Sequence, residues 1–322
     1  MHCLVCGAGG MIGGHLVKRL LADGHIVRAV DIKPFKEWYQ FFWEADNRRL
    51  DLATMAGCLQ SCLGMDWVFQ LSADMGGIGF IEGHKASCMQ SVLISTHMLQ
   101  AARYFKVKRF FYSSSACVYP AGKQSASNIT ALRESDAWPA EPEFGYGDEK
   151  IFTERMCRAF HDDYGLDVHI ARYHNIFGPC GTWDGGREKA PAALCRKIAQ
   201  ASEGDTIEIW GDGNQTRSFC YIDDCIDGTI RIMQSDYREP LNLGSNRLVT
   251  VLELAQMIAA IAGKHINFKF DVSKPQGVRG RNSDNTLIKQ VLGWEPSIPL
   301  GVGLEKLYRW VAEQIRISKL SL

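Results

Sequence analysis

The stretch CLVCGAGGMIG, residues 3–13, decides the fold of this 322-residue chain. Its four leading apolar residues predict a buried strand, and a helical run from Met11 to Ala22 follows the glycines. A glycine turn between a strand and a helix lets the backbone approach a pyrophosphate closely, and the helix N-terminus stabilises the phosphate charge. The sequence therefore predicts a dinucleotide-binding turn. Its candidate contacts are Gly7, Gly10, Met11, Ile12 and Gly13.

The second predicted strand, residues 25–31, ends in a carboxylate. Asp31 stands eighteen residues beyond Gly13, close to the place where an acid binds the ribose hydroxyls of a dinucleotide. Such an acid repels the 2′-phosphate of NADP, so the sequence predicts NAD as the cofactor. Lys33 lies nearby and opposes this prediction unless it is a solvated surface lysine.

Strands and helices alternate as far as residue 179, which predicts a Rossmann-type α/β fold with a doubly wound parallel sheet. A third strand is expected to end at 50–52, further strands are expected at 67–74, 109–114 and 168–172, and helices at 87–105 and 146–164. A smaller C-terminal α/β substrate lobe follows, with a strand at 206–210, a loop at 211–219 and helices at 191–201, 251–262 and 304–315. We assign 1–175 to the cofactor-binding domain, with 216–240 returning to it, and 176–215 and 241–322 to the substrate lobe.

Composition narrows the class of protein. Lys+Arg and Asp+Glu are equal at 36 each, so no net field favours nucleic acid or an anionic membrane. No apolar run is long enough to span a bilayer, and the glycine turn begins so early that a signal peptide has no room. Eleven scattered cysteines indicate reduced thiols and a cytoplasmic location. The pair Cys3 and Cys6 lies on an apolar strand without a second pair, so we predict no metal site.

A candidate proton-handling unit lies further along the chain. Tyr146 and Lys150 stand one helical turn apart on one helix face. An ammonium beside a phenol favours the phenolate, so we expect Lys150 to lower the pKa of Tyr146 and let it take a proton from a sugar hydroxyl. Ser115, at the end of the strand FFYSSS, offers a second hydroxyl to the same oxygen. Alone, Tyr-x-x-x-Lys is common on amphipathic helices, and the glycine turn is what gives it weight.

These motifs, in this order, resemble the extended short-chain dehydrogenase family. The resemblance implies that Asp51 contacts the adenine and that the ends of the neighbouring strands line the cofactor. The implied additional cofactor-binding residues are Asp51, Leu52, Leu71, Ala73, Tyr146 and Lys150. The two residues directly after Ser115, Ala116 and Cys117, are not acidic. This disfavours the sugar 4,6-dehydratases of the family, which carry an acidic residue there.

Longer stretches resemble one branch of that family, the GDP-mannose 3,5-epimerases. They cover residues 73–81, 111–120, 134–142, 185–193, 210–219 and 277–285. The resemblance implies that Cys117 and Lys189 are an acid/base pair acting on opposite faces of a 4-keto sugar, with tightly bound NAD regenerated in each cycle. Taken alone, Cys117 is a small hydrophobic residue and Lys189 a lysine in a polar loop. Asp184 would raise the pKa of Lys189 if the two lay close together.

The substrate implied by this resemblance is GDP-mannose, whose diphosphate needs cations. Arg217, Arg279, Arg281 and Lys197 are the candidates because guanidinium and ammonium groups suit phosphate oxygens; the alternative for each is a structural ion pair. The resemblance places further residues around the sugar and nucleotide: Met75, Gly76, Ser115, Ala116, Cys117, Asn175, Glu188, Lys189, Ala190, Gln215 and Thr216. It also implies a homodimer.

Three other functions stay open. A 3,5-epimerase/4-reductase of the GDP-fucose type uses NADPH and a histidine acid, against which Asp31 and Lys189 both argue. A nucleotide-sugar 4-epimerase needs neither Cys117 nor the loop of Lys189. A catalytically silent Rossmann nucleotide sensor would not need to retain Ser115, Tyr146 and Lys150 together. The sequence leaves open whether C5 alone or both C3 and C5 invert.

Overall fold

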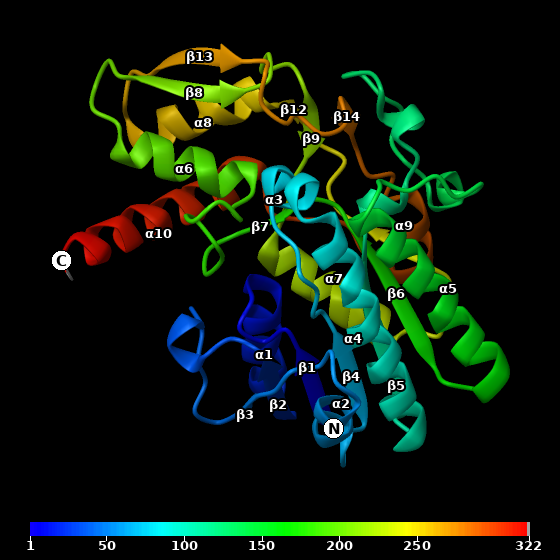
Figure 1. Ribbon diagram of the computed structural model, residues 1–322. Helices are drawn as coiled ribbons and strands as arrows, with labels where there is room; N and C mark the ends of the chain where they lie inside the picture. The colour runs from blue at the N-terminus through cyan, green and yellow to red at the C-terminus, as the bar shows by residue number, and fades with distance from the viewer. Residues whose placement is uncertain (321–322) are drawn as a thin grey trace.

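The computed structural model describes residues 1–320 and shows a seven-stranded parallel sheet of order β11-β6-β5-β4-β1-β2-β3 (Figure 1). The strand order turns back beside β1, so the carboxyl ends of β1 and β4 flank the switch point where α/β folds bind ligands. The predicted doubly wound fold is confirmed. The strands are β1 (His2–Cys6), β2 (Ile26–Asp31), β3 (Asp46–Arg49), β4 (Trp67–Gln70), β5 (Arg109–Ser115), β6 (Val168–Tyr173) and β11 (Leu241–Leu243).

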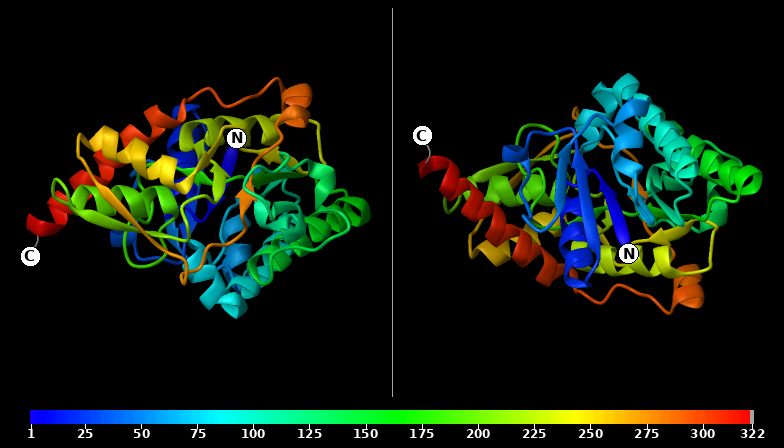
Figure 2. Two further views of the ribbon diagram at one scale, coloured as in Figure 1. Left: turned by 90° about the horizontal axis from the view of Figure 1, so that it is seen from above. Right: turned by 90° about the horizontal axis from the view of Figure 1, so that it is seen from below.

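Period-two alternation along β1 builds a core on each face of the sheet. Cys3 and Val5 pack into one hydrophobic cluster and Leu4 and Cys6 into the other, as side chains of a strand point alternately to opposite faces. One layer contains α1 (Met11–Ala22) and α7 (Ile222–Gln234), and the other α2 (Met55–Cys62), α4 (Lys85–Tyr104) and α5 (Tyr146–Tyr164). The right-hand view of Figure 2 shows the blue strands between these layers.

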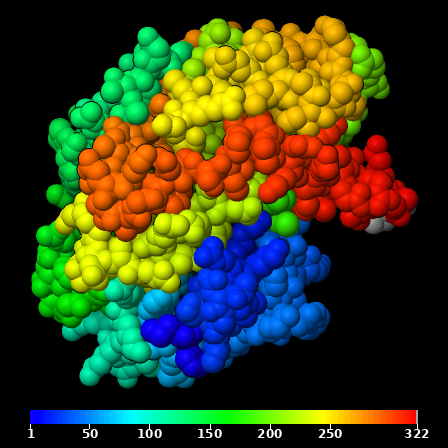
Figure 3. Space-filling view, turned by 180° about the vertical axis from the view of Figure 1, so that it is seen from behind, coloured from blue at the N-terminus to red at the C-terminus, as the bar shows by residue number. Residues whose placement is uncertain are grey.

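The smaller lobe lies beyond the carboxyl ends of the strands. Its two-stranded parallel sheet, β8 (Thr206–Trp210) and β13 (Asn267–Asp271), is accompanied by α6 (Ala190–Gln200), α8 (Val251–Ala262) and α10 (Leu300–Leu320). A second sheet has the order β12 (Leu248–Thr250), β9 (Thr216–Ser218) and β14 (Gly280–Arg281). From behind, these C-terminal elements, yellow to red, cover the upper half of the molecule (Figure 3). Between the described elements lie α3 (Ile78–Gly83), α9 (Thr286–Leu292) and 3₁₀ turns at Phe35–Glu37, Ala116–Val118, Ala121–Gln124 and Glu134–Ala137.

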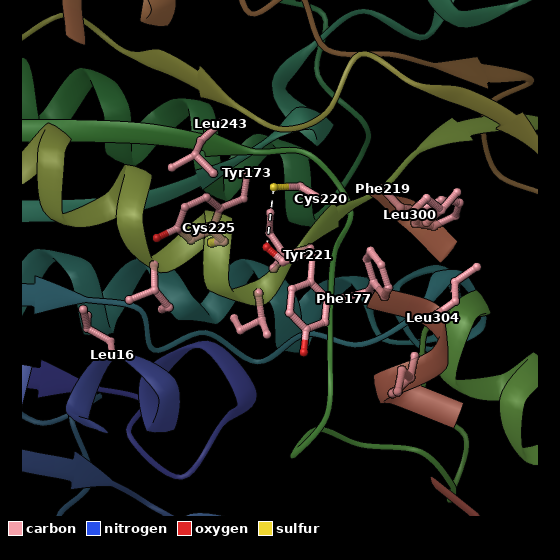
Figure 4. Close-up of a cluster of buried hydrophobic side chains, with 14 of the residues drawn as sticks. Leu16, Tyr173, Phe177, Phe219, Cys220, Tyr221, Cys225, Leu243, Leu300 and Leu304 are labelled. Carbon is pink, nitrogen blue, oxygen red and sulfur yellow. Dashed lines mark hydrogen bonds between the residues drawn. The ribbon is translucent and has the colours of Figure 1, made fainter. Parts of the chain in front are cut away.

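One continuous hydrophobic cluster joins the two parts. The short strands β7 (Ile176–Phe177) and β10 (Cys220–Tyr221) pair in parallel beside it. Figure 4 shows Phe177 and Tyr221 between Leu304 of α10 and the layer of α1 and α7, and all of these residues are buried. Because no boundary divides this core, the substrate lobe and the sheet hold each other in a defined position.

Several element boundaries differ from the sequence predictions. The third strand, expected to end at 50–52, is Asp46–Arg49 and ends just before that stretch, because an edge strand made of charged and polar residues gives no hydrophobic signal. The strand expected at 67–74 ends at Gln70, and the loop expected at 211–219 contains β9. Leu241–Leu243 pairs with β6, so the return to the main sheet extends past residue 240. Within residues 1–320, no helix has the length and apolar character needed to cross a membrane.

A buried polar network fastens the strands that carry the site. Arg172 of β6 forms two hydrogen bonds to Glu154 of α5, at 2.9 and 2.7 Å, and Ser114 of β5 binds the same carboxylate. Arg172 also donates to the hydroxyl of Tyr119, which in turn donates to Asn242 of β11 at 2.6 Å. Loss of one partner of a buried ion pair is destabilising because the other charge is left unpaired. The network therefore holds the segment after β5 in a defined position.

Candidate active site

The glycine turn forms a cradle suited to a pyrophosphate. Gly7 has φ +79°, and a Cβ at Gly13 would lie 2.2 Å from the carbonyl oxygen of Gly7. The helix α1 starts at Met11 with no side-chain cap from Gly10, so the first-turn N–H groups of Met11 and Ile12 have no partner within the helix and can donate to an anion. Leu71 closes the other side, with its backbone 3.2 Å from the position of a Cβ on Gly7.

Asp31 is fixed at the end of β2, and its geometry fits NAD. Its two carboxylate oxygens accept hydrogen bonds from the amides of Gly9 and Lys33, each at 3.0 Å. A carboxylate held there can accept from ribose hydroxyls and repels a 2′-phosphate. Asp51 lies beyond β3 rather than in it and caps the amide of Ala53 at 2.9 Å, while Leu52 is buried.

Sequence reasoning missed Trp38, which covers the glycine turn from outside. Its ring lies 2.7 Å from the position of a Cβ on Gly9, and its indole N–H donates to the carbonyl of Lys33 at 3.2 Å. The next residue, Tyr39, packs edge-to-face on Trp310 of α10. The segment therefore links the cofactor turn to the substrate lobe. The dense aromatic run FKEWYQFFW, residues 35–43, was the signal available in the sequence.

Trp38→Ala is expected to loosen the turn and release the cofactor. The indole packs on Gly9, whose amide holds Asp31, so its loss should speed NAD dissociation by about tenfold, or ~1.4 kcal/mol. The measurement is NAD content after gel filtration, together with the dissociation rate. Trp43→Ala is the matched control because Trp43 lies in the same run but is 88% exposed. Equal NAD retention by both variants would contradict the prediction.

Tyr146, Lys150 and Ser115 meet at the start of α5. Tyr146 is the first residue of the helix, and its phenol is hydrogen-bonded to Ser115. The Lys150 Nζ lies 5.3 Å from the centroid of the Tyr146 ring and donates to the carbonyl of Ser113 at 3.1 Å. Sequence reasoning placed these three side chains together, and they are together.

The expected direction of the Tyr146 pKa is wrong for this structure. Burial raises the pKa of Tyr146 well above its usual value, the nearby Cys117 and Glu149 add to this, and the bond from Ser115 opposes it. Lys150 is not among the groups that shift this pKa, and its Nζ lies 3.4 Å from the Glu149 carboxylate.

Cys117 lies on the 3₁₀ turn after β5, in one hydrophobic cluster with Tyr146, beside Ala73 and Met75. Lys189 precedes α6 at the N-cap position. Burial lowers the pKa of Lys189, and the charge of Cys117 opposes this shift, as does that of Cys225 on α7. The two candidate acid/base groups are therefore close enough to interact. No carboxylate lies within ion-pair distance of the Lys189 ammonium among residues 1–320.

The loop of Lys189 rests on the glycine-rich loop of Met75 and Gly76. The amide of Gly77 donates to the carbonyl of Arg187 at 3.0 Å, and a Cβ at Gly77 would lie 2.4 Å from the oxygen of Glu188. Asp184 turns away to Arg196, 3.4 Å from its Nε, and it is not among the charges that shift the pKa of Lys189.

The four candidate phosphate cations have different partners. Arg217 donates only to carbonyl oxygens, those of Thr216, Gln276 and Val278, and burial lowers its pKa to about 10. A half-buried guanidinium without a carboxylate partner within residues 1–320 suits an anionic ligand.

The other three cations are engaged elsewhere. Arg279 is held by both oxygens of Asp212, at 2.7 and 2.8 Å, which is the structural ion pair that the sequence left open. Lys197 donates to the carbonyl of Glu208 at 2.7 Å. Arg281 is buried and directed at Cys117, 3.5 Å from its sulfur.

Most of the remaining predicted substrate residues form hydrogen bonds to backbone groups of the protein. Asn175, at φ 45°, donates to the carbonyl of Ser218, and Glu188 binds Arg196 and the amide of Gly186. Gln215 donates to Trp210 and keeps a buried Oε1 with no partner within residues 1–320. Thr216 donates to Ser127, Ala116 is buried, and Ala190 opens α6. Within residues 1–320, no three His, Cys, Asp or Glu side chains are grouped so that they could hold a metal ion.

Comparison with known proteins groups this chain with enzymes of nucleotide-sugar chemistry. Residues 3–244 match the model of the NAD dependent epimerase/dehydratase family. The chain is 48% identical over 316 residues to GDP-mannose 3,5-epimerase 1 of Oryza sativa subsp. japonica, covering 98% of this chain and 82% of that protein. It is also 48% identical to the GDP-mannose 3,5-epimerase of Arabidopsis thaliana, over 98% of this chain and 83% of that protein.

Solved structures share the same architecture. UDP-glucose 4-epimerase of Thermotoga maritima, solved with UDP-glucose, superposes with a TM-score of 0.87 at 25% identity, covering 98% of this chain and 100% of that one. UDP-glucose 4-epimerase of Thermus thermophilus, solved with NAD, gives a TM-score of 0.84 at 19% identity, covering 97% and 99%. At 19% identity, the similarity to the Thermus thermophilus structure shows only that the two chains share a fold.

Proposed function

The chain belongs to the NAD-dependent epimerase/dehydratase family, and we propose that it converts GDP-D-mannose to GDP-L-galactose, or to GDP-L-gulose by C5 inversion alone. The observation that supports the proposal is that Cys117 packs with Tyr146 beside Met75, and that the backbone of Glu188 and Lys189 lies against Gly77 of the same glycine-rich loop. A second acid/base pair is what inversion next to a ketone requires, and a plain 4-epimerase does not need one.

In the proposed mechanism, Tyr146 takes the proton of the sugar C4 hydroxyl while Ser115 holds the same oxygen and Lys150 supports the developing negative charge. When bound, NAD supplies the reversible hydride acceptor that makes C4 a ketone and later restores the alcohol. The glycine cradle and Asp31 would hold it. No net oxidation results.

The ketone acidifies the protons on C3 and C5 by stabilising an enolate. Cys117 removes the C5 proton, and Lys189 delivers a proton to the opposite face, which inverts the centre. The same pair serves C3. Arg217, whose guanidinium donates to the carbonyls of Thr216 and Val278, binds the diphosphate, because a charge-assisted bond to an anion is stronger than one to a neutral oxygen.

The test is to incubate the protein, without added cofactor, with GDP-mannose in D₂O and follow the sugar by NMR. Deuterium at C3 and C5 with GDP-L-galactose appearing is the expected result, and deuterium at C5 alone restricts the product to GDP-L-gulose. Absence of exchange and of new sugar would exclude GDP-mannose as substrate. The same test with UDP-glucose would reveal a 4-epimerase, and a silent nucleotide sensor would turn over neither.

The activity should have an alkaline limit set by Lys189. A proton donor must be protonated, and burial lowers the pKa of Lys189, so turnover should fall as pH rises through a value below that of an ordinary lysine, about 10.4. The measurement is kcat at saturating substrate from pH 6 to 10. Lys189→Arg, which stays charged over this range, should turn over much more slowly. Its turnover should not show the alkaline decrease. A flat profile to pH 10 in the native enzyme would contradict the assignment.

We also propose a homodimer built on α4 and α5, which lie side by side in Figure 1. Large apolar side chains on and beside these helices are exposed, among them Leu93 at 46%, Phe144 at 67% and Phe152 at 51%. Exposed apolar patches of this kind mark association surfaces. Light scattering should give twice the chain mass, and Phe152→Lys should reduce it; a monomeric native protein would contradict the proposal.

The eleven free thiols support our proposal of a reducing, cytoplasmic setting.

A further inference from the structure

Arg187 stands two residues before Lys189 and ties the loop of Lys189 to the segment that follows β4. The carbonyl of Arg187 accepts the amide of Gly77 at 3.0 Å, and its guanidinium Nη1 donates to the Oδ1 of Asp74 at 2.6 Å. The backbone and the side chain of one residue therefore bind the same segment. Two attachments at neighbouring points restrict both the distance and the orientation of the loop.

The carboxylate that receives Arg187 is itself anchored. The amide of Asp74 donates to the hydroxyl of Ser91 at 2.9 Å, and the hydroxyl of Ser87 donates to the Oδ2 of Asp74. Both serines belong to α4, so the carboxylate is attached to the helix layer of the main sheet. Burial alone would raise the pKa of Asp74, but the hydrogen bonds from Ser87 and Arg187 hold it below its usual value. The acceptor is therefore charged and fixed in place.

The guanidinium of Arg187 also lies over an aromatic ring that packs beside the candidate base. Its Cζ is 3.8 Å from the ring centroid of Phe80, and His84 stacks on the same ring with the centroids 4.3 Å apart. Phe80 is buried in one hydrophobic cluster with Cys117. A cation over a ring face is attracted by the quadrupole of the ring. Arg187 therefore connects the loop of Lys189 to the wall that contains Cys117.

The other arginine of this region acts within the substrate lobe. Arg196 of α6 pairs with Glu188 at 2.8 Å and with Asp184 at 3.4 Å, which shapes the loop. Arg187 instead reaches Asp74, 113 residues away in the chain, on the side of the main sheet. Loss of the contact between Arg187 and Asp74 should therefore move the loop relative to the sheet and leave its internal shape intact.

We propose that Arg187 is a positioning residue: its ion pair with Asp74 holds Lys189 over the sugar face opposite Cys117 and so decides whether deprotonation ends in inversion. Inversion requires the returning proton to arrive on the face opposite the base. A misplacement of about 1 Å can cost about 10²-fold in rate, so a proton donor on a loop depends on whatever fixes that loop. This inference rests on the proposed function, in which Cys117 and Lys189 are the acid/base pair.

The experiment follows GDP-mannose in D₂O by NMR and measures two products of one reaction, the inverted sugar and deuterated GDP-mannose of unchanged configuration. In Arg187→Met, the ratio of the second product to the first should rise about tenfold, because the ion pair and the ring contact are both lost. Cys117 would still exchange the C5 proton, so the total exchange rate and KM should not change. Arg187→Lys keeps a charge for Asp74 but not the planar group over Phe80, and its ratio should be intermediate.

Two further variants test the partner and the specificity of the effect. Asp74→Asn should also raise the ratio, and adding it to Arg187→Met should cause no further rise, because the two side chains act as one unit. Arg231→Met is the matched control: the Arg231 side chain is 49% exposed and pairs with Asp227 at 2.8 Å, against 47% and 2.6 Å for Arg187. Its ratio should equal that of the native enzyme. A native ratio in Arg187→Met, or an equal fall of inversion and exchange, would overturn the proposal.

Backbone hydrogen exchange of the sugar-free protein separates failure of this inference from failure of the proposed function. A native enzyme that gives neither exchanged nor inverted sugar would reject GDP-mannose. The attachment of the loop is then tested by the Gly77 amide, whose exchange should become about tenfold faster in Arg187→Met and stay unchanged in Arg231→Met. An unchanged Gly77 amide would overturn the attachment itself.

The same measurement reveals a folding failure. If Arg187→Met unfolds, the amides of β1 exchange faster as well. The sugar ratio of Asp74→Asn then decides: a rise supports the proposal, and a native ratio overturns it.

Discussion

Lys189→Met is expected to stop formation of any inverted sugar while the enzyme still exchanges deuterium into substrate. Methionine keeps most of the length of the side chain and removes the ammonium group that donates the proton. General acid catalysis contributes about 10²–10⁴-fold, so GDP-L-galactose formation should fall by about 10³-fold. Cys117 would still remove the C5 proton and return a deuteron to the same face, giving labelled GDP-mannose of unchanged configuration.

The readouts of this variant are NMR of the sugar in D₂O and the NAD content of the purified protein. NAD should remain bound because Lys189, at the N-cap of α6, is not one of the residues expected to contact the cofactor. Lys269→Met is the control, since Lys269 is a surface lysine of β13 paired with Glu208. Loss of NAD in Lys189→Met, or native levels of product, would show that Lys189 is a structural residue and not the proton donor.

Tyr146→Phe is expected to abolish both product formation and deuterium exchange. Without the phenol no group takes the C4 hydroxyl proton, so the ketone does not form and the C3 and C5 protons stay inert. The rate should drop by about 10³-fold or more. The absence of deuterium exchange distinguishes Tyr146→Phe from Lys189→Met, which exchanges deuterium without inverting the sugar. The contrast places Tyr146 before the acid/base pair in the reaction order.

The measurement is the same D₂O experiment, with protein-bound NAD quantified in parallel. Tyr164→Phe is the matched control because Tyr164 ends the same helix and is 49% exposed. Exchange at C5 in Tyr146→Phe would mean that another group deprotonates the C4 hydroxyl. Ser115, which is hydrogen-bonded to the phenol, would then be the first residue to test by Ser115→Ala.

The fold could be predicted because its signals are local. Four apolar residues, a glycine turn and a helix follow one another within residues 2–22, and β1 and α1 form there. Asp31 likewise ends β2, where the strand pattern placed it. The end of the third strand was predicted slightly too late because β3 is an edge strand of charged and polar residues, which are satisfied by each other and by solvent rather than by a core.

The candidate site was predictable as a set of residues but not in its electrostatics. Tyr146 and Lys150 share a helix face, so helical periodicity alone brings them together. The direction of the Tyr146 pKa depends on burial and on Glu149, which shares the charge of Lys150. The aromatic run at residues 35–43 marks a packed segment, but which glycine Trp38 covers depends on the fold.

Local patterns in the sequence predict the doubly wound sheet, the NAD-type turn and the shared helix face of Tyr146 and Lys150, because each depends on spacing within one or two turns or strands. Which cation binds which partner depends on the tertiary structure. Arg279 meets Asp212 and Arg281 meets Glu143 across 67 and 138 residues of chain. Contacts at such separations arise from packing of the substrate lobe against the sheet, and no local pattern encodes them.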